Sequence, residues 1–350
     1  MAQDRLTSAF VLLGLAAPLM TWYAYRTPQT VFDTGFYQTP LWWAMTAGLL
    51  LVVAFVVIPR ELILGVALLY LVASSAWSAP FALSVATWLV LGGVFLIAAS
   101  RCPSRLLRVA LVGLGLLEIA LLGLQYAGLY FQVGEWRHNT AIPHGTFGNP
   151  RYLGAALAVI TPLAPLALLP VFGLGLVLSK SYAAILAASA GLVIRYHRKM
   201  RWPYVVAGGV SALGVLALLR GWSWDSLISR SIAWRVALAG WLDSWRSIIV
   251  GHGLGSWFPL GASFSVEDQV FYTAHSEYVQ LLYEAGLAGA GLLAWFLWRR
   301  RRWLAVSPGV AAILVVCLGL NPFRFASTAV VLLAVAGYEL GRGMDVPCAA

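Results

Sequence analysis

The chain has 350 residues, of which 61% are hydrophobic and only 10% are charged, and its formal net charge is +10. A soluble domain of this length carries roughly 25% charged residues, so the composition excludes a water-exposed globular protein and predicts one whose surface faces lipid. The 16 Trp and 14 Tyr residues suit a protein with two membrane–water interfaces, where amphipathic rings collect.

Apolar segments follow one another along the whole chain, and a bilayer crossing needs about 20 such residues. The sequence predicts twelve crossings, near 7–25, 41–58, 62–79, 81–100, 106–130, 152–169, 171–179, 181–195, 203–220, 278–298, 304–320 and 325–341. The first lacks a small-residue cleavage site at the right distance, which favours a retained span over a signal peptide. Leu169-Pro170 is the predicted turn between the sixth and seventh. We therefore expect residues 1–350 to form a single all-α polytopic transmembrane domain.

The placement of Lys and Arg predicts the orientation. If the N-terminus is cytoplasmic, most of the 23 basic residues fall inside, including the clusters RCPSRLLR, RYHRKMR and WRRRRW. An even number of crossings returns the C-terminus to the cytoplasm. The two substantial outside loops are then roughly 131–151 and 221–277, the second between spans 9 and 10.

These two outside loops hold four of the five histidines, together with several arginines that topology does not explain. They are His138, His144, His252 and His275, with Arg137, Arg151, Arg230 and Arg235. Ordinary solvation of a loop is the alternative explanation for any single one of them. No histidine pair has the i, i+4 spacing of a helical zinc site, and the three cysteines share no metal-ligand pattern. We predict no metal site and no disulfide framework.

The second outside loop contains a predicted amphipathic helix over about 226–249, lying along the outer interface with its tryptophans toward the membrane. The apolar stripe consists of Trp234, Leu238, Trp241, Trp245 and Ile248. Arg230 and Arg235 are about 140° apart around such a helix, so both cannot face one ligand. The following GHGLGSW predicts a bent, closely packed loop, and Gly286 and Gly289 are predicted packing sites in the tenth span.

A few ionisable residues lie within or beside apolar segments. Lys180 is flanked by apolar sequence, which marks a functional candidate, although snorkelling to an interface is the alternative. Glu118 and Glu284 are candidates for burial. His275 precedes the tenth span by about one turn, where an imidazole can exchange a proton near neutral pH; a cap or an interfacial group is the plainer interpretation of this histidine.

Three motifs in this order resemble the O-antigen ligase and O-antigen polymerase superfamily over about residues 130–300. They are GTFGNPRYLG, an Arg-x-x-x-Trp followed by glycine alternation, and AHSEYVQLLYEAGLAG, in which Ser276 stands where the family usually has Asn. The resemblance implies a GT-C-like membrane glycosyltransferase fold of about twelve helices, with a periplasmic loop that carries amphipathic helices.

The resemblance also implies roles for single residues. His275 matches the general base that acts on the acceptor hydroxyl, and Arg230 matches the arginine that engages the diphosphate of the donor. Ser179-Lys180 falls where the family usually has Ser-Arg, so the charge is kept while the bidentate guanidinium fork is lost. Arg151 falls where the first motif commonly has Asn and is a candidate for the missing phosphate contact.

The remaining substrate-binding candidates come from the same motifs. They are Trp234, Arg235, Asn149, Glu277 and Tyr278.

The expected activity is transfer of a glycan from undecaprenyl diphosphate to an acceptor hydroxyl at the periplasmic face of the bacterial inner membrane. It is expected to be inverting, independent of metal and without a cofactor, and no nucleic-acid partner is expected. Lipid A–core as the acceptor, which makes the protein an O-antigen ligase, is favoured. A polymerase with a lipid-linked glycan as its acceptor is the first alternative, and a transporter or flippase for an anionic lipid or solute is an alternative from another class.

Overall fold

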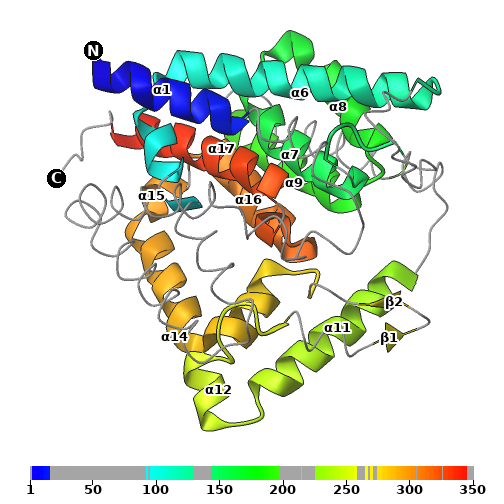
Figure 1. Ribbon diagram of the computed structural model, residues 1–350, viewed down its shortest axis with the longest axis vertical. Helices are drawn as coiled ribbons and strands as arrows, with labels where there is room; N and C mark the ends of the chain where they lie inside the picture. The colour runs from blue at the N-terminus through cyan, green and yellow to red at the C-terminus, as the bar shows by residue number, and fades with distance from the viewer. Residues whose placement is uncertain are drawn as a thin grey trace, which may run out of the picture.

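The computed structural model is mostly helical and describes residues 2–15, 92–93, 95–129, 143–147, 149–196, 214, 225–257, 265–266, 269–270, 274–304, 306–324 and 326–344 (Figure 1). Its α-helices are α1 (Ala2–Leu15), α6 (Ser104–Tyr126), α7 (Pro150–Ile160), α8 (Leu169–Leu178), α9 (Tyr182–Tyr196), α11 (Asp225–Trp241), α12 (Trp245–Val250), α14 (Glu277–Arg299), α15 (Arg301–Leu304), α16 (Pro308–Gly319) and α17 (Ala326–Met344). The predicted spans 41–58 and 62–79 lie outside the described residues, as do all but one residue of 203–220. The count of twelve crossings therefore stays a prediction.

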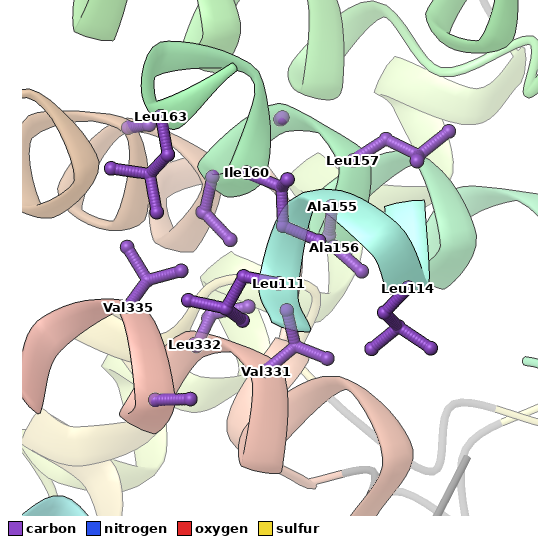
Figure 2. Close-up of a cluster of buried hydrophobic side chains, with 14 of the residues drawn as sticks. Leu111, Leu114, Ala155, Ala156, Leu157, Ile160, Leu163, Val331, Leu332 and Val335 are labelled. Atoms are coloured by element: carbon purple, nitrogen blue, oxygen red, sulfur yellow. The ribbon is translucent and has the colours of Figure 1, made fainter. Parts of the chain in front are cut away.

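The main core lies where α6, α7, α9, α16 and α17 pack together, and Figure 2 shows the part of it between α6, α7 and α17. Almost every residue of α7 is buried, which makes this short helix the centre of the bundle. Small side chains such as Ala155 and Ala156 let the neighbouring helices approach closely. A second, smaller core joins α11 to α14 through Ala233, Ala237 and Tyr283, and α11, α12 and α14 form the lower part of Figure 1.

Two of the described helices, α6 and α14, are long and apolar enough to cross a membrane, and three shorter apolar helices cover 166–178, 182–196 and 308–319. Large apolar side chains are exposed on the outside of the bundle, among them Val109 on α6, Leu174 on α8 and Leu318 on α16. Such a surface is unfavourable in water and favourable in hydrocarbon.

The turn that the sequence places at Leu169-Pro170 is wrong. These two residues begin α8, where proline is tolerated because the first turn of a helix needs no N–H from it. The chain instead breaks earlier, after α7, through the 3₁₀ turns η3 (Thr161–Leu163) and η4 (Leu166–Leu168). The predicted sixth span, 152–169, therefore contains only one short α-helix.

Two arginines satisfy the backbone carbonyls that this break exposes. Arg108 of α6 donates to Leu163 O at 2.8 Å, and Arg195 of α9 donates to the carbonyls of Pro162 and Ala164. Arg195 also lies within electrostatic reach of Arg342, near the end of α17. Basic residues thus gather at the end of the bundle where α6 begins and where α9 and α17 end.

The single helix predicted over 226–249 is also wrong. The helix stops at Trp241, and Ser244 starts the separate helix α12 as its N-cap. The Ser244 side chain accepts from the Ser247 N–H, and the Ser247 hydroxyl accepts from the Ser244 N–H. The break also interrupts the predicted tryptophan stripe, and Trp245 is 80% exposed. The same loop holds a short antiparallel pair, β1 (Ser265–Val266) and β2 (Gln269–Val270), with Ser265 opposite Val270.

Candidate active site

The first outside loop is attached to α6 by two polar side chains, half-buried Gln125 and buried Glu118. Gln125 accepts from the N–H groups of His144 and Gly145, both at 2.8 Å, and donates to Gly145 O. Two turns earlier, Glu118 accepts from the Thr146 N–H at 2.9 Å and from its hydroxyl at 2.6 Å. The predicted burial of Glu118 is confirmed, and its partner, which the sequence does not reveal, is this loop.

Immediately after the attached loop, Asn149 starts α7. Its side-chain oxygen accepts from the Arg151 N–H at 2.9 Å, and Pro150 occupies the first turn, where its fixed φ suits a helix. Arg151 is therefore held in the first turn of the most buried helix, with its side chain half-buried. The observed contact of Asn149 is structural, because it positions Arg151.

Lys180 lies at the junction of α8 and α9 and adopts a left-handed backbone, with φ of 52°. It follows the C-terminal residues of α8, a position where glycine is usual. Ser181 then accepts from the Ala184 N–H and caps α9. The ammonium group lies 5.9 Å from the centre of the Tyr126 ring, and the lysine side chain is exposed. The exposed ammonium group thus stands where α6 ends and α9 begins.

Arg230 of α11 reaches the C-terminal end of α16. A Cβ atom built on Gly319 would lie 3.5 Å from Nη1 of Arg230 and 3.4 Å from the Cβ of Ala183 in the first turn of α9. Both distances are ordinary van der Waals separations, so the guanidinium lies directly against the end of α16. This contact brings Arg230 beside the segment that carries Lys180, although the two are fifty residues apart.

His275 lies just before α14 and is the second described non-glycine residue with positive φ, at 54°. Burial, followed by the positive charges of Arg230 and then Arg151, lowers the pKa of its imidazole from 6.5 to about 4. The two arginines are thus close enough to His275 to act on its charge. At neutral pH the imidazole is uncharged and able to accept a proton.

Three helices begin around these residues: α7 at Arg151, α9 next to Lys180 and α14 next to His275. The N-terminal end of a helix carries a partial positive charge and unpaired N–H groups, which suit an anion. Together with Arg151, Lys180 and Arg230, they make this end of the bundle strongly attractive for a polyanionic group. It lies at the opposite end of α6 and α9 from the cluster of Arg108 and Arg195.

The GHGLG segment packs against a break in α14, which confirms the bent, closely packed loop. Gly286 interrupts α14 with φ of 59°, and the freed carbonyls of Tyr283 and Glu284 accept from the N–H groups of His252 and Gly253 at 3.0 and 2.8 Å. A side chain on Gly286 would come within 2.5 Å of Ile249 O. The imidazole of His252 stacks on the Tyr283 ring, with 4.5 Å between centroids. This contact helps to hold the loop against α14.

The remaining substrate-binding candidates lie on α11 and at the start of α14. Arg235 is exposed on α11, whereas Arg230 on the same helix interacts with His275. The indole N–H of Trp234 is buried and has no partner among the described residues. Glu277 accepts from the Phe323 N–H at 2.9 Å, and Tyr278 donates to Leu314 O at 2.8 Å. These last two contacts attach the start of α14 to the chain in and after α16.

Sequence reasoning missed a buried polar network behind His275. Gln280 joins Glu284 on its own helix to Asn321, which follows α16, and all three side chains are buried. The burial predicted for Glu284 is confirmed. The i, i+4 spacing of Gln280 and Glu284 in an otherwise apolar helix was the available signal. Asn321 had none, because only the folded chain brings it beside α14.

The described residues contain no group of three or more His, Cys, Asp or Glu side chains that could hold a metal ion, and both described cysteines, Cys102 and Cys317, are free. The arrangement offers one uncharged imidazole and three cations, which can stabilise a diphosphate and take a proton from a hydroxyl group. In comparisons with known proteins, no family model matches the chain and no curated protein matches it significantly.

Proposed function

We propose that this chain is an integral membrane glycosyltransferase of the bacterial inner membrane, which moves a glycan from undecaprenyl diphosphate to an acceptor hydroxyl at the periplasmic face. The preferred acceptor is lipid A–core, which makes the protein an O-antigen ligase with both termini in the cytoplasm. The motif resemblance supplies the substrate class. The apolar side chains exposed on the outside of the bundle, and the two helices long enough to cross a membrane, support the membrane location.

One observation carries the proposal. Lys180 and His275 are the two described non-glycine residues with left-handed backbone, and both are also candidates from the sequence motifs. Such a conformation is unfavourable by about 1–3 kcal/mol, and it persists at functional sites where the surroundings impose it. His275 moreover lies within the electrostatic influence of Arg230 and Arg151.

The reaction follows from these charges. The acceptor hydroxyl gives its proton to the uncharged imidazole of His275, and its oxygen forms a bond to the anomeric carbon. The bond from that carbon to the phosphate oxygen breaks on the opposite face, and the lipid diphosphate leaves with the electron pair. Arg230, Arg151 and Lys180 stabilise the charge that grows on the leaving group, which lowers the barrier most where the dielectric is low.

The separation of charges within the bundle supports the orientation. Arg108, Arg195 and Arg342 gather at one end, as the positive-inside rule expects of a cytoplasmic face. Arg230 and His275 lie at the other end, which in this orientation is the outer leaflet, where a lipid-linked donor presents its diphosphate.

The direct test is a gene deletion followed by electrophoresis of envelope polysaccharide. Loss of all glycan on lipid A–core, with lipid-linked polymer retained, is the expected result. A ladder replaced by a single repeat unit would instead establish a polymerase. Purified protein reconstituted with donor extracted from the deletion strain then separates transfer from transport, since His275→Ala should bind the lipid-linked donor and fail to transfer its glycan. Equal transfer by that variant would refute the mechanism.

A further inference from the structure

The strained backbone at His275 is held from behind by a chain of three buried side chains. Gln280 Oε1 accepts from the Ala274 N–H at 3.2 Å and from Asn321 Nδ2 at 3.1 Å, and its Nε2 donates to Glu284 Oε1 at 2.9 Å. Ala274 and Glu284 are fully buried, and Gln280 and Asn321 nearly so. The residue immediately before His275 is thus bonded to the helix that follows it.

The direction of each hydrogen bond in this set of side chains is fixed by the groups at its two ends. The Ala274 N–H can only donate, so the oxygen of the Gln280 amide must face it, and the amide nitrogen must face Glu284. Asn321 must then present its own amide nitrogen to Gln280. A carboxylate at position 280 could still accept from the Ala274 N–H. It could not donate to Glu284, however, so two acceptors would meet where the wild-type protein has a donor and an acceptor.

We propose that Gln280, oriented by Glu284 and Asn321, is a positioning residue that holds His275 in its left-handed conformation, with the imidazole toward the reacting hydroxyl. This inference rests on the proposed transfer activity. The supporting bonds act from within the protein, since Gln280 is buried and its side chain bonds to Ala274, Glu284 and Asn321.

Gln280→Glu and the exchange variant Gln280→Glu/Glu284→Gln form the test. In the exchange variant, the carboxylate at 280 accepts from Ala274 and Asn321, and the new amide at 284 donates to it, so the three side-chain bonds at position 280 are restored. Full-length protein is purified in detergent, with lipid-linked donor extracted from the deletion strain and rough lipopolysaccharide as the acceptor. Glu339→Gln is the matched control, since Glu339 is a buried residue that accepts from the Gly309 N–H at the other end of α16.

Gln280→Glu should lower kcat by about 10- to 100-fold, the usual effect of a slightly misplaced catalytic group, while KM for the donor stays within about twofold of wild type. The loss should diminish as the pH falls, because a protonated carboxyl group donates to Glu284 as the amide does. The exchange variant should recover kcat to within about threefold of wild type. Glu339→Gln should keep its kcat even if its melting temperature falls.

An unchanged kcat in folded Gln280→Glu overturns the inference, as does a folded exchange variant that stays as slow as the single one. If Gln280→Glu does not accumulate, Asn321→Asp carries the test, because it also removes a donor to Gln280. A wild-type protein without transfer activity would refute the proposed function itself. Wild-type transfer that is lost in His275→Ala and kept in Gln280→Glu would refute only the positioning role.

Discussion

Replacing Arg230 by glutamine should move the acid limb of the pH–rate profile to higher pH. The positive charge of Arg230 lowers the pKa of His275, second in effect only to burial, so its removal raises that pKa toward the ordinary value of 6.5. The acid limb of kcat/KM reports the free enzyme. In the wild-type protein this limb should lie near pH 4, because protonation of His275 removes the base.

The size of the shift follows from the order of the causes. The interval from 6.5 to about 4 corresponds to about 3 kcal/mol at 1.36 kcal/mol per pKa unit. Since burial is the largest cause, Arg230 accounts for less than half of it, and Arg230→Gln should move the limb upward by at most about one pH unit. Arg151→Gln should give a smaller shift in the same direction.

The assay is initial-rate transfer in detergent between pH 3.5 and 8 with subsaturating donor. If Arg230 binds the diphosphate as proposed, Arg230→Gln should also weaken that binding, which lowers the height of the profile and leaves the position of its limb unaffected. Arg246→Gln is the matched control, because Arg246 is exposed on α12. A limb that stays in place or moves to lower pH in Arg230→Gln would refute the electrostatic coupling. A wild-type limb near pH 6.5 would refute the burial of the base.

Three further changes test separate parts of the structure. Lys180→Gly should raise the melting temperature, because glycine adopts the left-handed backbone of this position without strain. The same change should lower transfer by about tenfold or more through loss of the positive charge. Equal transfer would remove Lys180 from the mechanism. Gly286→Ala should abolish monodisperse protein on size exclusion, because a Cβ would strike Ile249 O, whereas Gly291→Ala, with open space around it, should behave as wild type. Thr146→Val should lower the free energy of unfolding by about 1–2 kcal/mol, because Glu118 loses a buried hydrogen bond, and an unchanged melting temperature would contradict this.

The helical segments of the described bundle were predictable because their signal is local. Hydropathy placed the fifth, eighth, tenth, eleventh and last spans within a few residues of α6, α9, α14, α16 and α17. The errors arose where one residue permits two local structures. Pro170 fits the start of a helix as well as a turn, and Ser244 fits a helix cap as well as a helix interior.

The residues of the candidate site can be proposed one by one from the sequence, but their arrangement cannot. Lys180 stood out because it interrupts apolar sequence, and His275 because it adjoins a motif. Helical spacing showed that Arg230 and Arg235 could not act together, but only the packing of α11 against α14 and α16 selects Arg230. Asn321 ends an apolar run and carries no sequence signal, since its partner is forty-one residues away.

The same charges that make the site attractive to a diphosphate make His275 a weak base while the site is empty. A base whose pKa is about 4 has little tendency to take a proton from a hydroxyl group at neutral pH. A bound diphosphate would offset the charges of Arg230 and Arg151 and so raise the pKa of His275. The acid limb of kcat, which reports the donor complex, should therefore lie at higher pH than that of kcat/KM. The acceptor hydroxyl would then be activated only after the donor has bound, so the electrostatics would set the order in which the two substrates act. Acid limbs of kcat and kcat/KM at the same pH would contradict this.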